Sequence, residues 1–235
     1  MLFQTLDDKK NCIAIYKNGS LGDYESDANL THTWTASEYL KGLSIEYAYL
    51  YCQKDLKDIC PDYLREELDE ILGLLRAFSI SLVESKIDTN QHCFYDLIPE
   101  SFLVRFCEIK NKISQHVFQN YGRPKNYPFL RQLHAIMQEI SHRKLDLDFS
   151  RIPVRHLSFA AANKLKSARS TAPYVRYNIL GSKTGRMTTR SGSFPILNIN
   201  KEFRQAILPT NDRFVELDFN AFELRILLYL LDKEQ

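Results

Sequence analysis

Apolar side chains recur every three or four residues in four stretches of the chain, which is the spacing of amphipathic helices. One of these stretches begins with a proline followed by an acid, Pro99-Glu100, and both residue types are favoured in the first turn of a helix. A shorter stretch rich in small residues, from His156 to Ser170, predicts a further helix. The four long stretches are Tyr63–Glu84, Pro99–Phe118, Pro128–His142 and the run that begins at Phe222.

Alternation of apolar and polar residues predicts strands elsewhere. The segment Asn11–Leu21 contains Asn18-Gly19, a strong hairpin signal. Leu43–Cys52 is rich in tyrosine and isoleucine, residues that favour strands. Tyr174–Leu180 and Phe214–Phe219 also alternate, so we expect two more strands in the second half of the chain.

The last predicted strand leads directly into the last predicted helix. Asn220 followed three residues later by Glu223 matches a capping box at the start of that helix. Asp218 therefore lies where a strand ends and a helix begins, a place where ligands often bind. An aspartate there is more often a turn former or a helix cap, so its chemistry stays open on this evidence alone.

The order of these elements predicts an α+β protein in three parts. Residues 1–95 form a small α/β region. Its first strand, Ile13–Tyr16, carries no acid, which argues against a metal-dependent exonuclease there. Residues 96–150 hold two long helices joined by a turn near Gly122, which we expect to pair as an antiparallel hairpin. Residues 151–235 hold antiparallel strands with helices, after a shift to basic composition near residue 150.

The composition is that of an ordinary globular protein, with 44% hydrophobic and 26% charged residues in 235. Five cysteines without any CxxC spacing argue against a disulfide framework and a zinc site. His116, His134 and His142 lie at spacings that do not suit a metal site, and we expect packing or surface roles for them. No apolar run is long enough to cross a membrane and no secretory signal is present, so we expect a cytoplasmic protein without membrane contact.

Positive charge is concentrated in the second half of the chain. Between Arg151 and Arg213, twelve Lys or Arg residues stand against only Glu202 and Asp212, a local balance of +10 in a chain of net charge +2. Such asymmetry indicates an anionic partner, most commonly a polyphosphate backbone, although a solvated basic surface gives the same pattern.

The segment Gly181–Gly192 combines glycines, hydroxyls and cations, the groups that hold phosphate oxygens. It is not a Walker loop, because Gly-Lys-Ser/Thr at a helix start is missing. Its candidate phosphate ligands are Lys183, Thr184, Arg186, Thr188 and Arg190.

Three segments of the last sixty or so residues, SKTGRMTT, FPILNINKEFRQAI and VELDFNAFELRILLYLL, carry a resemblance. In order and spacing they are similar to the palm of family A DNA polymerases, the group of bacterial DNA polymerase I and many phage replicative enzymes. That family has a TGR segment, a leucine-asparagine stretch, an arginine and then an aspartate strand of consensus roughly DYSQIELR. The resemblance implies template-directed DNA synthesis, with a thumb-like helical hairpin ahead of the first part of a palm.

The resemblance also implies roles for single residues. Asp218 matches the first metal-binding aspartate, with the carbonyl of Phe219 as a further ligand for one of two Mg²⁺ ions. Glu223 matches the glutamate that favours deoxynucleotides, and Arg225 an arginine that supports the site. Arg186 matches a contact to the minor groove of primer-template DNA, and Asn198 and Arg204 match further primer or template contacts. The reaction implied is two-metal transfer of a nucleotide from a dNTP to a primer 3′-hydroxyl.

The sequence departs from the family in two ways. Phe219, Asn220, Ala221 and Phe222 stand where the consensus has Tyr, Ser, Gln and Ile, and Leu197 and Asn200 replace a usual Gln and Pro. These changes fit a divergent phage-like branch, in a bacterial or phage-infected cell, and leave the minor-groove contacts near Leu197 open. In the family, the nucleotide-binding fingers helix and the second metal aspartate would come after Gln235. We therefore expect the chain alone to be inactive, as a truncated product, a cut piece or one half of a split polymerase.

Two other classes of protein share part of this pattern. A non-catalytic DNA-binding module would keep the basic half without needing Asp218. A single-subunit RNA polymerase has a palm and an aspartate in this place, but lacks a glutamate like Glu223.

Overall fold

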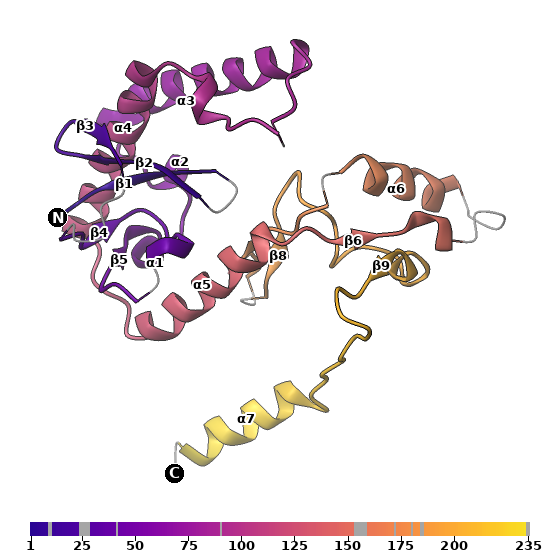
Figure 1. Ribbon diagram of the computed structural model, residues 1–235. Coiled ribbons are helices and arrows are strands. Elements are labelled where there is room, and N and C mark those ends of the chain that lie inside the picture. Colours follow the sequence, from indigo (N-terminus) through magenta and orange to yellow (C-terminus); the bar gives the residue numbers. More distant parts are fainter. Residues whose placement is uncertain are drawn as a thin grey trace.

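The protein is built from mixed helices and strands with small sheets, as the α+β prediction requires (Figure 1). The computed structural model describes residues 1–8, 11–23, 29–40, 42–89, 91–152, 159–171, 173–179, 181–183 and 186–233. In this part of the chain the buried apolar side chains form three clusters, which we call the first, second and third core.

A three-stranded antiparallel sheet opens the chain, in the order β1 (Gln4–Asp8), β2 (Asn11–Lys17) and β3 (Ser20–Gly22). Asn18 and Gly19 both have positive φ, 54° and 88°, which is the backbone of a tight two-residue hairpin turn. The hairpin prediction for this segment is confirmed. Strand β1 has no counterpart in the sequence prediction, since two acids at its end obscure the alternation.

The strand prediction for Leu43–Cys52 is wrong. Only β5 (Glu46–Tyr47) is extended, paired in parallel with β4 (His32–Thr33), and the chain then turns into α1 (Ala48–Cys52). Ala48 is buried in the first core and Leu50 in the second, so this segment contacts apolar residues on both of its sides. A short segment that is apolar on both sides can be a helix or a strand, and its composition alone does not predict which. A short helix α2 (Leu56–Ile59) follows.

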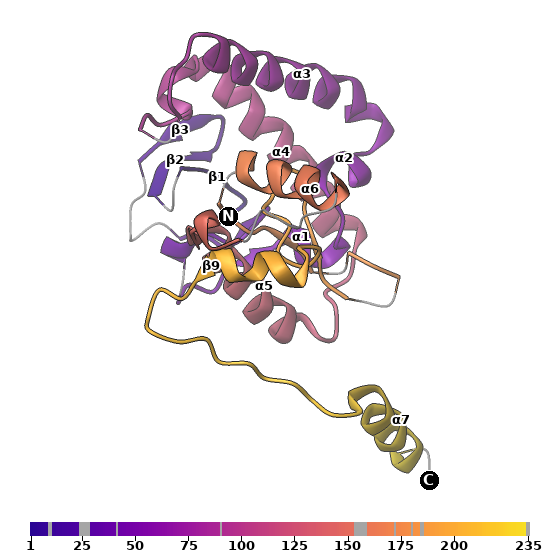
Figure 2. The ribbon, with the colours of Figure 1, turned by 90° about the vertical axis from the view of Figure 1, so that its right-hand side faces the viewer.

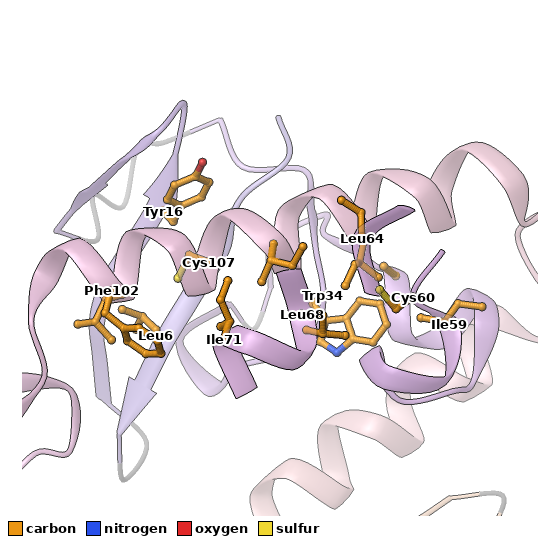
Figure 3. Packing of buried hydrophobic residues seen from close by; sticks show 14 of the residues in the cluster. Leu6, Tyr16, Trp34, Ile59, Cys60, Leu64, Leu68, Ile71, Phe102 and Cys107 are labelled. Carbon is orange, nitrogen blue, oxygen red and sulfur yellow. The ribbon is translucent and has the colours of Figure 1, made fainter. Parts of the chain in front are cut away.

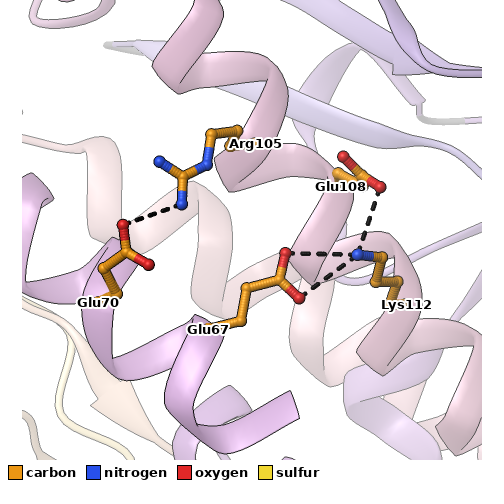
Figure 4. A network of polar contacts seen from close by, with 5 residues as sticks. All are labelled: Glu67, Glu70, Arg105, Glu108 and Lys112. Atoms are coloured by element: carbon orange, nitrogen blue, oxygen red, sulfur yellow. Dashed lines mark hydrogen bonds and ion pairs between the residues drawn. The ribbon is translucent and has the colours of Figure 1, made fainter.

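The two longest helices, α3 (Asp62–Glu84) and α4 (Glu100–Asn120), confirm the periodicity of their sequences and pack on each other. Two ion pairs cross between them: Arg105 lies 3.0 Å from Glu70, and Lys112 lies 3.3 Å from Glu67 (Figure 4). Lys112 also lies 3.3 Å from Glu108, one turn earlier on its own helix. Exposed pairs of this kind contribute at most about 1 kcal/mol each. The burial of apolar side chains beneath them therefore holds the helices together.

The first core lies between these helices and the sheet. Leu6 and Tyr16 from the sheet, Trp34 from a loop and Ile71 from α3 meet the buried face of α4 (Figure 3). This core draws on residues from both sides of position 95, where a domain boundary was expected.

Helix α5 (Tyr127–His142) is present as predicted, but the expected hairpin with α4 is wrong. α4 packs mainly on α1, α2, α3 and the first two strands, whereas α5 packs on α1 and the short helix η1 (Glu38–Leu40). Tyr127 and Leu130 enter the second core with residues such as Phe3 and Ile45. The two helices share α1 as a partner but do not pair with each other as a hairpin, and α5 runs away from α4 (Figure 1).

The third core is built from the basic half of the chain. Two-stranded pairs join β6 (Asp146–Leu147) to β9 (Ile207–Leu208), and β7 (Tyr177–Asn178) to β8 (Thr188–Thr189). Helix α6 (Phe159–Ser170) and the short helices η3 (Phe149–Arg151) and η5 (Lys201–Ala206) cover them. The predicted helix is confirmed from Phe159 on, and residues 156–158 lie outside the described part. The predicted strand Tyr174–Leu180 is reduced to the two residues of β7.

The last segment leaves the body of the protein as an extended arm and ends in α7 (Phe222–Lys233) (Figures 1 and 2). The final helix is confirmed, but the strand prediction for Phe214–Phe219 is wrong. The segment is extended without pairing to a strand in the described part of the chain, and all of its side chains are exposed. An alternating sequence needs a neighbouring strand to become a sheet, because single strands satisfy none of their backbone hydrogen bonds.

Among the described residues, no helix combines the length and the apolar character that crossing a membrane requires.

Candidate nucleic-acid interface and metal-binding segment

The loop between β7 and β8 carries the predicted phosphate ligands. Gly181 lies so close to Thr188 that a β-carbon at position 181 would overlap the Thr188 side chain. Ser182 closes the loop, because its hydroxyl accepts from the Arg186 N–H at 2.9 Å and donates to the Arg186 carbonyl at 3.2 Å. Lys183 and Arg186 are exposed on this loop, whereas Thr188 is partly buried over Gly181. Thr184 lies outside the described residues.

Arg190 belongs to the same hairpin but faces the N-terminal half. Its Nε donates to Asn178 at 2.8 Å, and the side chain lines a cavity of about 240 Å³ with Tyr49, His134 and Arg176. The Arg190 side chain thus lies between the hairpin and α5, and the residue is exposed. Arg190 can therefore join the two halves of the protein, and its role in phosphate binding stays a prediction.

Asn198 and Arg204 lie at the surface of the third core, and both are exposed. In η5, Phe203 and Ala206 point inward, so Arg204 is turned to solvent. The backbone N–H of Asn198 donates to the Pro195 carbonyl at 3.0 Å, which fixes a turn at this position. Both residues therefore present polar groups to solvent.

Asp218 and Phe219 lie in the extended arm, just before the turn into α7. Asp218 is exposed, and the Phe219 ring lies 5.6 Å from the ring of Phe222. The predicted capping box is wrong. The helix begins at Phe222, so Ala221, with a φ of 54°, precedes it and Asn220 lies one residue too early. A positive φ at alanine is unfavourable and marks the turn as a tight one.

Glu223 and Arg225 make contacts that the sequence prediction did not include. Glu223 accepts from Arg186 at 3.0 Å, which joins the TGR segment to the start of α7. The Nε of Arg225 donates to the Asn220 carbonyl at 3.0 Å and ties the helix back to its own turn. Both partners of the Arg186–Glu223 pair are largely exposed, so the pair adds at most about 1 kcal/mol to stability. The pair matters for position more than for stability, because it holds together two segments whose paired residues are 37 positions apart in the sequence.

The oxygen atoms available for a metal ion in this segment are the carboxylate of Asp218 and the carbonyl of Phe219. Mg²⁺ is commonly held by one or two carboxylates while keeping several waters, so the chemistry of this pair suits it. Within the part of the chain that is described, no three His, Cys, Asp or Glu side chains are grouped as a metal site would need. The five cysteines are free thiols.

Sequence reasoning missed the cavity that Arg190 shares with Tyr49 and His134. The Tyr49 and His134 rings stack at 5.3 Å between centroids, and the His134 Nε2 accepts from the Ala36 N–H at 3.3 Å. These residues are far apart in sequence and their grouping depends on how α5 packs, so no local pattern could have revealed it.

Comparison of the chain with protein-family models, with curated proteins and with solved structures finds no match.

The buried His134 predicts a pH-dependent stability. Burial, and secondarily the charge of Arg190, lower the pKa of His134 to about 4, whereas the same group in the unfolded chain titrates near 6.5. The unfolded state then binds more protons between these values. The free energy of unfolding should be at its full value above pH 6.5 and fall by up to about 3 kcal/mol as the pH drops to 4. Urea unfolding from pH 4 to 8 measures this.

The matched variants are His134→Gln and His92→Gln, the second an exposed histidine. We expect His134→Gln to flatten the pH dependence and His92→Gln to leave it unchanged. An equally steep fall in both variants would show that other groups are responsible.

Proposed function

We propose that this chain serves template-directed DNA synthesis as the first palm portion of a family A-type DNA polymerase, together with the helical region that precedes it. The observation that carries the proposal is the ordered occurrence of SKTGRMTT, FPILNINKEFRQAI and VELDFNAFELRILLYLL with the spacing of that family. It is supported by the Arg186–Glu223 pair, which links the first of these segments to the last at 3.0 Å.

In this proposal each residue has a defined task. Asp218 and the Phe219 carbonyl would hold Mg²⁺ at the primer end, and the bound ions would make the 3′-hydroxyl more acidic and stabilise charge on the transferred phosphate. Glu223 lies against the sugar edge of the incoming dNTP and disfavours a 2′-hydroxyl. Arg225 keeps the turn in shape through its bond to the Asn220 carbonyl.

The basic residues of the third part bind the primer-template DNA. Lys183, Arg186 and Arg204 are exposed and belong to the region of local charge +10. Cations at such positions release counterions from the DNA backbone and supply affinity that falls steeply with salt. Thr188 and Arg190, which are tied into the hairpin, position the loop.

The second metal-binding aspartate and the fingers helix come from outside these 235 residues in this proposal, from a continuation of the chain or from a second polypeptide. The apolar side chains of the arm and α7 support such a completion. Val215, Leu217 and Leu224 are more than half exposed, and a large exposed apolar surface commonly marks an interaction site.

A non-catalytic DNA-binding module is the second candidate. The exposure of Lys183, Arg186 and Arg204 favours DNA binding whether or not Asp218 holds a metal. A single-subunit RNA polymerase is a weaker alternative, because Glu223 would then face a nucleotide that needs its 2′-hydroxyl accommodated.

The first test measures binding and incorporation by the 235-residue protein. We expect weak, salt-sensitive binding to a fluorescent primer-template and no incorporation of dNTP with Mg²⁺. Lys183→Gln combined with Arg186→Gln should weaken binding about tenfold and lower the salt slope by about 2. Fluorescence anisotropy at several salt concentrations and a primer-extension gel provide the readouts.

The control for charge is Arg76→Gln combined with Lys86→Gln, two exposed cations on and after α3. It should change DNA affinity little. Equal loss in both double variants would mean that net charge alone drives binding, and nucleotide incorporation by the isolated protein would contradict the expectation of an incomplete site.

A further inference from the structure

A cavity of about 240 Å³ lies between α5 and the β7–β8 hairpin, where the two halves of the protein meet. Tyr49 and His134 line it from the N-terminal half, and Arg176 and Arg190 line it from the hairpin. Among the described residues that line it there is no Asp or Glu. The cavity is smaller than the roughly 300–1,000 Å³ of sites for drug-sized ligands, so it suits a small ion or a single group of a larger molecule.

The two arginines stand opposite each other on neighbouring strands. β7 and β8 pair Tyr177 with Thr189 in antiparallel register. The next pair along this ladder is Arg176 and Arg190, and the Arg190 N–H donates to the Arg176 carbonyl at 2.8 Å. Like charges at opposite positions of an antiparallel pair destabilise it. In the described part of the chain no acid forms an ion pair with either guanidinium, so an anion between them would relieve the repulsion.

Arg190 is held in place by groups that carry no charge. Its Nε donates to the side chain of Asn178 at 2.8 Å. Burial raises the pKa of Tyr49, and the charge of Arg190 partly offsets this rise. His134, whose pKa is lowered to about 4, is neutral near pH 7, and its Nε2 already accepts from the Ala36 N–H at 3.3 Å. None of these neighbours therefore neutralises the guanidinium.

Arg176 keeps its guanidinium available for a ligand. Its backbone N–H donates to the Ser193 hydroxyl at 2.8 Å, which fixes the position of the residue, and its side chain makes no hydrogen bond to another described residue. Gln138 lines the same cavity from α5, and a glutamine amide can donate as well as accept. Guanidinium forks and amide N–H groups are the donors that match phosphate oxygens.

A neighbouring cavity of about 180 Å³ provides a contrast. It shares Tyr49 and Ile179 with the first cavity but carries Asp55 and Asp58 beside Lys54. Its charges are of both signs, whereas the charged side chains that line the first cavity are two arginines. Of the two, the first cavity is the one whose electrostatics favour an anion.

We infer that the cavity between α5 and the β7–β8 hairpin binds a single phosphate group, held by Arg176 and Arg190 together. Two sources supply this chemistry, the free phosphate ion and the backbone of a nucleic acid, and the experiment separates them. The site itself does not depend on the proposed polymerase function, whose DNA contacts are Lys183, Arg186 and Arg204. The second source alone rests on that function.

The test follows the arginine Nε–H signals by NMR while inorganic phosphate is added to the 235-residue protein at constant ionic strength. We expect saturable shifts of the Arg176 and Arg190 signals, with a dissociation constant of about 1 mM or lower. Arg176→Gln and Arg190→Gln should each weaken phosphate binding about tenfold or more. The control for charge, Arg76→Gln combined with Lys86→Gln, removes two exposed cations elsewhere and should leave binding unchanged.

Thermal unfolding of Arg176→Gln provides a second readout. In chloride buffer its Tm should be no lower than that of the unchanged protein, because one of two opposed charges is gone. Phosphate should raise the Tm of the unchanged protein and not that of the variant, since a ligand stabilises only the state that binds it. If Arg190→Gln fails to fold, the Arg176→Gln result decides. The inference is overturned if millimolar phosphate gives no saturable shift, or if Arg176→Gln binds phosphate as tightly as the charge control.

Addition of primer-template DNA identifies the source of the phosphate. If DNA shifts the same two arginine signals and inorganic phosphate competes with it, the site takes a backbone phosphate. If DNA leaves them in place while inorganic phosphate shifts them, the site takes the free ion. Either result supports the cavity as a phosphate site. Lys183→Gln combined with Arg186→Gln separates the proposals, because loss of DNA binding with phosphate binding retained shows that the cavity acts independently.

Discussion

Phe203→Ala is expected to unfold the third core and to abolish DNA binding. Phe203 is 1% exposed and packs in η5 against a small cluster that includes Phe194 and Leu165. Removing a buried phenylalanine costs about 3–5 kcal/mol through lost transfer energy and the cavity left behind. A core of this size has little surplus stability, because whole domains are stable by only about 5–15 kcal/mol.

The measurement separates the third core from the others. Trp34 is the single tryptophan and lies in the first core, so its fluorescence follows unfolding there. Amide hydrogen exchange of residues 159–171 and 194–206 follows the third core. We expect Phe203→Ala to lose exchange protection in those segments, while the Trp34 transition in urea stays near its original midpoint.

The matched control is Phe219→Ala, the same substitution at a position that is 72% exposed. Its effect on stability should stay within about 0.5 kcal/mol. Should Phe203→Ala leave the exchange of the third core unaltered, the packing described for Phe203 would be incorrect. A parallel shift of the Trp34 transition would instead mean that the cores unfold as one unit.

The helices could be predicted from the sequence because their stabilising contacts repeat along the chain. Each turn of α3, α4 and α5 presents an apolar residue to the same side of the helix, and this period does not depend on which element the helix packs against. The partner itself is not encoded locally. Two amphipathic helices joined by a short link suggest a hairpin, yet α4 packs on α1 and α3, and α5 packs on α1 and η1.

The strands were harder to predict because a strand is stable only with a neighbour. The segment at Asn18-Gly19 supplies its own neighbour through a tight turn, so that hairpin was foreseeable. Phe214–Phe219 has the same alternation, but its pairing partner would have to come from elsewhere, and no described strand lies beside it. Alternation thus predicts a capacity to pair, and the pairing itself depends on distant residues.

The candidate site also combines features that the local sequence predicts with features that depend on distant residues. Lys183 and Arg186, which the sequence marks as candidate phosphate ligands, are exposed on their loop. The pair between Arg186 and Glu223 depends on where the arm leaves the third core, which no local pattern specifies. The capping box failed for a related reason, since the positive φ of Ala221 moves the start of the helix by one residue.

Asp218→Ala is expected to abolish nucleotide transfer while leaving the fold and the DNA affinity intact. Asp218 is exposed in an extended segment, so its loss should change stability by no more than about 0.5 kcal/mol. In the proposed mechanism its carboxylate would hold Mg²⁺, and a metal that stabilises transition-state charge is worth several kcal/mol. Extension should therefore fall by about a thousandfold or more.

The assay tests the proposed function by adding to the protein a polypeptide that carries a fingers helix and a second metal-binding aspartate. Primer extension with dNTP is compared with extension with rNTP, and primer-template affinity is measured in parallel. Asp212→Ala is the matched control, because it removes the same charge from an exposed position at the start of the same arm. It should retain extension.

If Asp218→Ala and Asp212→Ala extend primers equally well, Asp218 is not a metal ligand. If no complement restores extension while DNA binding persists, the chain is a binding module. Preference for rNTP would identify an RNA polymerase and remove the assigned role of Glu223.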